Sequence, residues 1–171
     1  MSRLKAILVA LMVGAVPSPV NLAWAGETVL GPVTNLPVPR YVSLRSSEIN
    51  VRRGPGLDYR KDWVFRRAGL PVQVVEEYGD WRRIVDKDQT GGWVYHAMIT
   101  GRRTVVITGG DIYFRERPTH TAAATAMAEQ GVVARLRACQ PDWCQVEKDG
   151  YRGWVPKAMI WGVDPAEVLG E

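Results

Sequence analysis

Short apolar runs, each bounded by Gly, Pro or Asp, set the pattern of this chain after residue 40. Examples from the first half are Ile49–Val51, Val72–Val75, Ile84–Val85 and Gly92–Val94. Helical periodicity is scarce, and runs of this length and spacing are typical of the strands of an all-β sandwich or barrel. We therefore expect an all-β fold made of small antiparallel barrels.

Alternation within the runs predicts which side chains lie in the core. Successive side chains of a strand point to opposite faces. Val72 and Val74 should therefore point inward, and Gln73 should face water. The same rule places Arg82 on the face of Ile84, so a charged side chain is expected to share a face with an apolar one.

The pattern occurs twice along the chain. Trp81 follows Gly-Asp, and Trp143 follows Pro-Asp 62 residues later. Trp93 and Trp154, which are 61 residues apart, each lie between Gly and Val. Each copy of an internal repeat is usually one folding unit. The repeat therefore predicts two small barrels in tandem, and duplicated small units are usually built to bind.

Two segments do not follow the repeat. Residues 121–130 contain five alanines and are expected to form a long loop, with a helical turn as the alternative. Residues 105–107, Val-Val-Ile, lie in the short connection between the copies. We expect them to pair as a strand or to be buried between the barrels. A connection this short predicts a fixed arrangement of the two barrels.

The N-terminus has the order of a secretory signal peptide: positive charge, an apolar run, then small residues. Arg3 and Lys5 precede the apolar run over residues 6–16, and an Ala-Trp-Ala sequence ends at Ala25. We expect cleavage after Ala25 and a periplasmic or secreted mature protein. The run is shorter than the roughly 20 residues that span a bilayer as a helix. No later segment is apolar enough to do so, and no integral membrane segment is expected in the mature chain.

These features divide the chain into five parts. The stretch before the first copy contains Pro32, Pro37 and Pro39, and is expected to be an extended tether or an edge segment. The expected parts are a signal peptide (1–25), a Pro-containing tether (26–40), barrel 1 (41–101), barrel 2 with its linker strand (102–164) and a C-terminal tail (165–171).

The basic surplus of the chain is small once the signal peptide is removed. The formal net charge of +4 falls to +2, because cleavage removes Arg3 and Lys5. Arginine pairs at residues 52–53, 66–67, 82–83 and 102–103 concentrate positive charge around the first copy. They would suit an anionic partner or lie on solvated faces. Export removes the usual nucleic-acid substrates, so no nucleic acid is expected as a partner.

The two cysteines are expected to form a disulfide. Cys139 and Cys144 bracket Gln-Pro-Asp-Trp, a turn-forming stretch between two apparent strands, and exported proteins oxidise such pairs. Their counterparts in the first copy are Glu77 and Arg82, which could form an ion pair across the same turn. The spacing is wrong for a redox motif, and no second pair completes a metal site, so no metal is expected.

Several motifs now identify a family resemblance. Ile-Asn-Val-Arg-Arg-Gly-Pro-Gly at 49–56, followed by Gly69, Gly79-Asp80-Trp81 and Gly92-Trp93-Val94, resembles the bacterial SH3 (SH3b) signature. Residues 142–146 and 153–156 also resemble the eukaryotic SH3 pattern. Residues 39–45, 62–67 and 101–104 are similar to exported proteobacterial proteins with two SH3-like units and no assigned activity. The resemblance implies two tandem five-stranded SH3-like barrels.

The resemblance also implies where a ligand would bind. It places Trp81 and Trp143 at the mouth of a groove, where an indole can stack and donate one hydrogen bond. Capping of the barrel is the alternative role for both. Met98 and Met159 stand where eukaryotic SH3 domains keep a tyrosine, which disfavours Pro-rich ligands. The candidate ligand-binding residues are Trp81, Tyr95, Trp143, Pro156, Tyr59 and Trp63. The extra aromatic surface of the first copy could instead seat the second barrel.

Catalytic groups are sparse in the sequence. His96 and His120 lie in different copies and have no counterpart in the other, and the expected disulfide removes a free thiol. We expect no enzyme activity and no cofactor. The leading hypothesis is an exported binding module for peptidoglycan, either glycan or stem peptide. The alternative is a periplasmic adaptor that docks another envelope protein.

Overall fold

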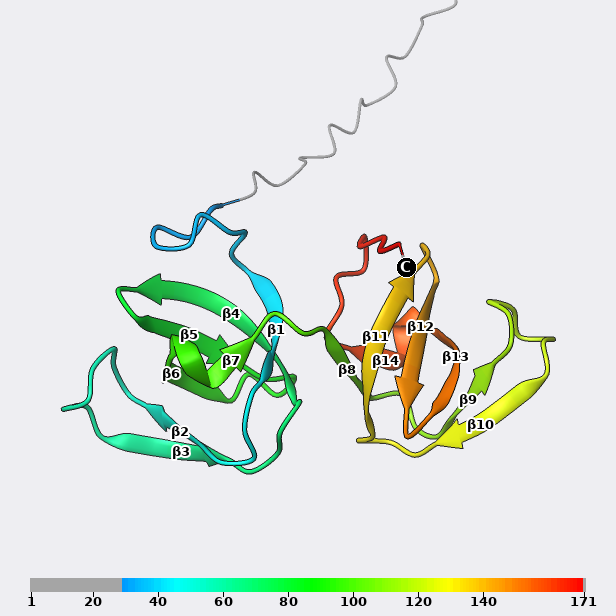
Figure 1. Cartoon of the computed structure of the whole chain (residues 1–171), viewed down its shortest axis with the longest axis horizontal. Helices are drawn as coiled ribbons and strands as arrows, with labels where there is room; N and C mark the ends of the chain where they lie inside the picture. Colours follow the sequence, from blue (N-terminus) through cyan, green and yellow to red (C-terminus); the bar gives the residue numbers. More distant parts are fainter. Residues whose placement is uncertain (1–28, 171) are drawn as a thin grey trace, which may run out of the picture.

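The computed structural model describes residues 29–170. This part of the chain forms two antiparallel sheets of seven strands, each folded around a hydrophobic core of its own (Figure 1). We call them barrel 1 and barrel 2. The predicted signal peptide and the cleavage after Ala25 lie outside the described residues.

The two barrels have the same strand order. Barrel 1 consists of β1 (Arg40–Leu44), β2 (Ile49–Arg52), β3 (Lys61–Phe65), β4 (Pro71–Tyr78), β5 (Trp81–Val85), β6 (Gly91–Tyr95), the 3₁₀ turn η1 (His96–Met98) and β7 (Ile99–Thr100). Its sheet has the order β3-β2-β6-β5-β4-β1-β7.

Barrel 2 repeats this order with each strand number raised by seven. Its elements are β8 (Thr104–Ile107), β9 (Ile112–Arg115), β10 (Ala124–Ala128), β11 (Val133–Cys139), β12 (Trp143–Lys148), β13 (Tyr151–Pro156), η2 (Lys157–Met159) and β14 (Ile160–Trp161). The all-β tandem predicted from the repeat is therefore confirmed.

The strand faces follow the predicted alternation. Val72 and Val74 are fully buried, whereas Gln73 between them is partly exposed. Arg82 is buried on the face of Ile84, and its charge is compensated there by the carboxylate of Glu77 3.5 Å away. The ion pair predicted across the β4–β5 turn is thus present.

Two features of the sheets differ from the expectations. Each barrel has seven strands rather than five, and the hairpins β2–β3 and β9–β10 lie at one end of the strand order in their sheets. Residues 124–128 form strand β10, not a helical turn or an irregular loop. Its alanines pair with β9, from Ala124 opposite Arg115 to Ala128 opposite Ile112. Main-chain pairing and burial of Ala128 outweigh the weak strand propensity of alanine.

The segment before β1 is not an extended tether over its described part, residues 29–39. Leu30 pairs with Pro37, which closes a tight loop. The Glu77 carboxylate of barrel 1 accepts hydrogen bonds from the amides of Val33 (3.1 Å) and Thr34 (2.9 Å) and from the Thr34 hydroxyl (2.6 Å). The loop is therefore fastened to barrel 1 by one buried carboxylate.

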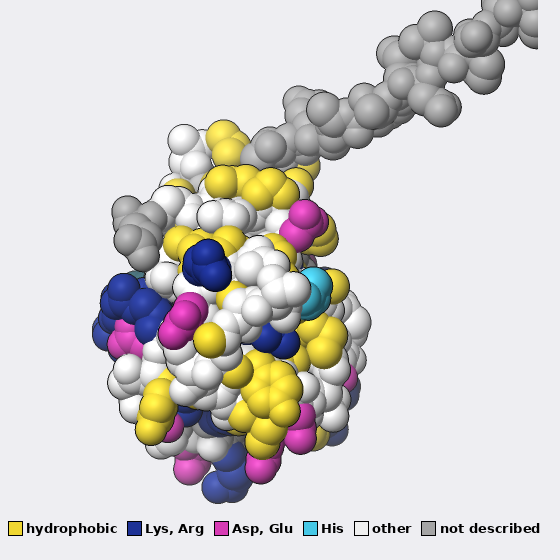
Figure 2. All heavy atoms as spheres, turned by 90° about the vertical axis from the view of Figure 1, so that its right-hand side faces the viewer, with side chains coloured by type: hydrophobic (Ala, Val, Ile, Leu, Met, Phe, Trp, Pro, Cys, Tyr) yellow, Lys and Arg dark blue, Asp and Glu magenta, His cyan; other side chains and the backbone are white. Residues whose placement is uncertain are grey.

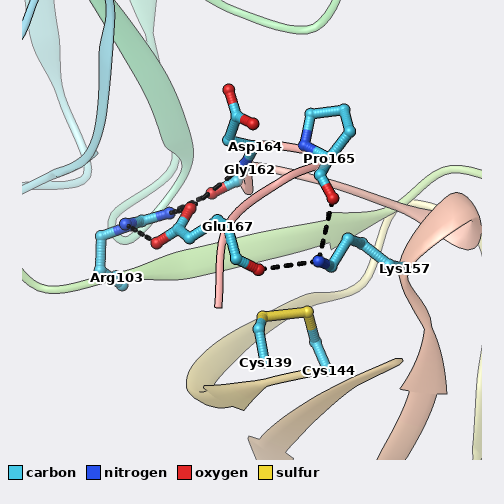
Figure 3. Close-up of a disulfide and its surroundings, with 8 residues drawn as sticks. All are labelled: Arg103, Cys139, Cys144, Lys157, Gly162, Asp164, Pro165 and Glu167. Carbon is cyan, nitrogen blue, oxygen red and sulfur yellow. Dashed lines mark hydrogen bonds and ion pairs between the residues drawn. A yellow bond between two sulfur atoms is a disulfide. The ribbon is translucent and has the colours of Figure 1, made fainter. Parts of the chain in front are cut away.

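The C-terminal segment is fastened to barrel 2 in a comparable way (Figure 3). Leu169 and Cys139 exchange backbone hydrogen bonds of 2.8 and 3.0 Å. Glu167 forms an ion pair of 2.6 Å with Arg103, and the buried Lys157 ammonium donates to the carbonyl oxygens of Pro165 (3.1 Å) and Glu167 (2.8 Å). The predicted disulfide Cys139–Cys144 is also present at this end of barrel 2.

The barrels meet along a polar seam. The hydroxyls of Ser43 on β1 and Thr104 on β8 lie 2.6 Å apart. Ser43 also contacts the carbonyl oxygen of Arg102 (2.6 Å), and Thr104 contacts that of Gly69 (2.7 Å). The two hydroxyls have one proton each, so only two of these three short contacts can be hydrogen bonds at one time. As predicted for residues 105–107, β8 is a buried strand, and it pairs with β11 and β14 inside barrel 2.

Candidate functional site

A groove of about 630 Å³ lies on barrel 2 where it meets barrel 1. We call it the junction groove, and its lining includes Tyr41, His120, Trp143, Pro156, Trp161 and Val163. Figure 2 shows the molecule from the side of barrel 2, with hydrophobic side chains exposed between separated charged groups. The groove volume falls in the range of about 300–1,000 Å³ that is usual for small-ligand sites.

Trp143 is held in the groove by the turn that precedes it. The disulfide Cys139–Cys144 joins paired positions of β11 and β12, and the Asp142 carbonyl accepts the Lys157 amide at 2.8 Å. Trp143 then begins β12 directly opposite Pro156 of β13. These contacts fix the indole beside the η2 turn, where it is half-buried.

His120 and Trp143 form an edge-to-face pair inside the groove. Their ring centroids are 4.8 Å apart, at an interplanar angle of 60°. His120 has no counterpart in the first repeat, so the repeat pattern gave no reason to place it in a site. Both rings line the groove.

Tyr41 supplies the wall of the groove that comes from barrel 1. Its ring packs edge-on against Trp161 with the centroids 5.2 Å apart, and the Arg103 guanidinium lies 5.7 Å from its centroid. Burial raises the pKa of the Tyr41 phenol, and the Asp164 carboxylate raises that pKa further. The phenol is therefore neutral at physiological pH and can donate a hydrogen bond.

Barrel 1 presents a different surface at the equivalent position. Trp81 lies opposite Tyr95, and the two rings pack edge-on with their centroids 5.8 Å apart. The centroid of the His96 ring lies 4.6 Å from that of Tyr95. The Asp80 carbonyl accepts the His96 amide at 2.8 Å, as Asp142 does for Lys157. The backbone frame is thus repeated, but an aromatic ring faces Trp81 where Trp143 faces a proline.

The remaining two candidates lie on or beside the β2–β3 hairpin of barrel 1. Tyr59 packs over Gly54, where a Cβ atom would collide with the ring, and Trp63 packs edge-on against Phe65 at 6.4 Å. Half of each side chain is exposed. The six predicted ligand-binding residues therefore occupy three places: Trp143 and Pro156 in the junction groove, Trp81 and Tyr95 on barrel 1, and Tyr59 and Trp63 at the hairpin. Their role in binding stays a prediction.

Trp161 is a groove residue that the sequence did not suggest, whereas Tyr41 is expected from the sequence only as part of the extra aromatic surface of the first copy. Tyr41 belongs to barrel 1, so no pattern within a single repeat connects it with Trp143. Trp161 did leave a signal, because the first repeat has Thr100 at the corresponding position. An aromatic residue found in only one copy indicates a feature that the other copy lacks.

Residues 29–170 contain neither a metal-ion cluster nor a membrane-spanning helix. In that range no group of three or more His, Cys, Asp or Glu side chains is arranged to hold a metal ion. No helix in the same range has the length and apolar character needed to cross a bilayer. The cysteines are joined to each other, so neither is a free thiol.

Two comparisons with known proteins bear on this site. The family model for the bacterial SH3 domain matches residues 45–101 and 111–162, one stretch in each barrel. The chain is also 26% identical over 128 residues to the "Putative N-acetylmuramoyl-L-alanine amidase YrvJ" of Bacillus subtilis (strain 168). That alignment covers 68% of this chain and 24% of the relative, so the chain corresponds to about a quarter of that protein.

Proposed function

Because the chain belongs to the bacterial SH3 domain family, we propose that it is an exported, non-enzymatic module that binds peptidoglycan through the junction groove. Bacterial SH3 domains commonly bind cell-wall material. The observation that carries the proposal is the meeting of Trp143, Trp161 and Tyr41 around one hollow on barrel 2.

The chemistry of the groove suits a glycan or a stem peptide. Indole and phenol rings offer apolar faces to the C–H surfaces of sugars or to aliphatic side chains, and their N–H and O–H groups can bond to ligand oxygens. Pro156 pairs with Trp143 across the strands and adds an apolar side chain to the groove lining. A rigid frame of this kind loses little conformational entropy on binding.

Pro-rich peptides are a poorer match for the groove. Met159 holds the position at which an aromatic ladder would need a tyrosine. Its side chain packs against the core of barrel 2 and lies so close to Gly109 that a Cβ atom there would collide with its sulfur. The groove therefore lacks the row of rings that grips a polyproline helix.

The similarity to the amidase-named protein supports the cell wall as the target. The name of that relative refers to the bond between N-acetylmuramic acid and L-alanine, and this chain matches only about a quarter of it. We propose that this chain shares the recognition of the wall and not the hydrolysis. The disulfide supports an oxidising location outside the cytoplasm, in the periplasm or beyond.

A second candidate function is that of an adaptor for another envelope protein. It is favoured by the exposed apolar side chains at the β2–β3 hairpin: Leu57 (75% exposed), Tyr59 (50%) and Trp63 (50%). Surfaces of this kind are typical of protein contacts. Cross-linking in cells separates the two candidates, because an adaptor gives a discrete protein adduct at the hairpin.

Retention on purified sacculi tests the main proposal. The purified chain, Trp143→Ala and Trp81→Ala are incubated with sacculi, pelleted and quantified. We expect the parent and Trp81→Ala to be retained and Trp143→Ala to be largely lost, with circular dichroism showing all three folded. Absence of the parent from the pellet at low salt would refute the proposed function.

A further inference from the structure

A second hollow, separate from the junction groove, opens at the seam between the barrels. We call it the seam cleft; it has a volume of about 410 Å³ and is lined by Ser43, Arg45, Ala68, Gly69, Thr100 and Arg102. Tyr41 and Arg45 are four residues apart, which corresponds to roughly 13 Å along an extended chain. The buried contact between Ser43 and Thr104 lies between the two sites.

Two arginines that line the seam cleft, Arg45 and Arg102, have no carboxylate partner among residues 29–170. Arg45 and Arg102 are exposed, and the side-chain contact of Arg45 is a long 3.4 Å approach to the Ile99 carbonyl. By contrast, Arg40 and Arg103, which flank the same seam, are paired with Glu77 and Glu167 at 2.7 and 2.6 Å. No acidic residue lines the cleft within this range either.

The other polar groups of the cleft already have partners. The Ser43 hydroxyl and the Gly69 carbonyl take part in the seam contacts, and the Thr100 hydroxyl accepts the Arg102 amide at 3.4 Å. The adjacent Arg67 donates to the Gly131 carbonyl across the seam at 2.8 Å. The two lining arginines therefore supply N–H donors and positive charge that no carboxylate of residues 29–170 takes up.

We propose that the seam cleft is a second binding site, which takes carboxylate groups of cell-wall peptides. A guanidinium presents two parallel N–H donors that match the two oxygens of a carboxylate, and such charge-assisted pairs are stronger than neutral hydrogen bonds. Two unpaired guanidinium groups in a cleft without acidic side chains complement this charge. The assignment of the carboxylate to cell-wall peptides rests on the proposed function. Binding of a ligand in the seam cleft is tested independently of that function.

Nuclear magnetic resonance with soluble muropeptides tests the site. The full chain is titrated with muropeptides and with the same muropeptides after their carboxyl groups have been amidated. We expect the native muropeptides to shift the backbone amides of Gly69, Thr100 and Arg102, and the amidated ones to leave them unchanged. The affinity should fall as ionic strength rises, because both arginines are exposed to solvent.

Substitutions identify the groups responsible. Arg45→Gln and Arg102→Gln should each lower the affinity measured from the seam amide shifts about tenfold, since each removes one charge-assisted partner. Arg60→Gln is the matched control: it removes the same charge from an exposed position whose arginine is already paired with Asp62 at 2.6 Å. Should one variant fail to fold, the other variant and the amidated ligand still test the site.

The outcomes separate this proposal from the proposed function. If muropeptides shift the seam amides but the chain is not retained on sacculi, the proposed function is refuted and the seam cleft remains a binding site. Retention on sacculi with unchanged seam amides would refute the cleft alone. Equal seam shifts with inorganic phosphate would show a general anion site and would contradict the assignment to peptide carboxylates.

Discussion

Glu77 and Cys139 occupy equivalent positions in the two repeats, and each fastens the chain segment that lies outside its repeat. The Glu77 carboxylate binds the loop that contains Thr34, and the Cys139 backbone binds Leu169. The cross-strand partner is equivalent too: Arg82 faces Glu77 as Cys144 faces Cys139. The same point of the barrel is thus closed by an ion pair in one copy and by a disulfide in the other.

Replacing Glu77 by glutamine should destabilise barrel 1 strongly. The Glu77 side chain has no exposed surface, and the change leaves Arg40 (2.7 Å) and the nearly buried Arg82 (3.5 Å) without their counter-charge. Breaking a buried pair by removing one partner costs about 3 kcal/mol or more. Urea unfolding measures the loss. Glu76→Gln, next in sequence but exposed and 3.4 Å from Arg83, is the control and should change the free energy of unfolding by less than about 1 kcal/mol.

The same carboxylate predicts a loss of stability in acid. Burial would raise the pKa of Glu77, but hydrogen bonds from Thr34, Arg40 and Val33 outweigh burial and lower that pKa from 4.5 to about 2. The unfolded chain therefore binds the proton first, and the stabilisation is fully present above pH 4.5 and disappears as the pH falls toward 2. The shift is equivalent to about 3 kcal/mol.

Unfolding of the parent and of Glu77→Gln at several pH values checks this prediction. The difference in their free energies of unfolding should be largest near pH 6 and should shrink as the pH falls from 4.5 to 2. A difference that is independent of pH in that range would show that the Glu77 charge is not responsible.

Reduction of the disulfide should weaken barrel 2 only modestly. Cys139 and Cys144 are five residues apart, and closing so short a loop stabilises by about 2 kcal/mol in the chain-entropy description. Dithiothreitol should therefore lower the free energy of unfolding of the parent by about that amount. The double variant Cys139→Ala, Cys144→Ala serves as the control, because its stability should not respond to dithiothreitol.

The local features of this fold could be predicted from the sequence because they depend on neighbouring residues. Alternation identified Val72 and Val74 as core residues, and both are fully buried. The turn between Cys139 and Cys144 predicted their pairing. The repeat predicted two barrels in tandem, since turn residues (Gly and Pro) and an Asp-Trp pair recur at corresponding positions in each copy.

The features that sequence reasoning missed depend on contacts between distant segments. Residues 124–128 become a strand because β9 offers its edge, which outweighs the weak strand propensity of alanine. Thr34 is ordered by Glu77, 43 residues away. Tyr41 reaches the groove from the neighbouring barrel. No spacing within one repeat encodes any of these contacts.

The seam hydroxyls should be energetically coupled. Ser43→Ala and Thr104→Val each remove one of the two hydroxyl protons that the seam contacts share, so each should cost about 1 kcal/mol. A double-mutant cycle on the free energy of unfolding should give a coupling of about 1 kcal/mol, because both changes disrupt one network. Strictly additive losses would contradict a shared network.

Tyr41 should contribute to wall binding although it lies in barrel 1. Its ring packs on Trp161 and lines the same groove as Trp143, so Tyr41→Ala opens one wall of the site. We expect retention on sacculi to weaken about tenfold, similar to the effect of Trp143→Ala, while Tyr41→Phe keeps most of the binding because it keeps the ring.

Tyr78→Ala is the matched control for Tyr41→Ala, since it removes an exposed tyrosine from the same barrel at the end of β4. Its retention on sacculi should equal that of the parent. A Tyr41→Ala variant that is folded and fully retained, beside a Trp143→Ala variant that is lost, would show that barrel 2 binds alone. If Tyr41→Ala and Trp143→Ala both weaken retention on sacculi, then binding needs the two barrels to stay in contact, because the groove exists only where they meet.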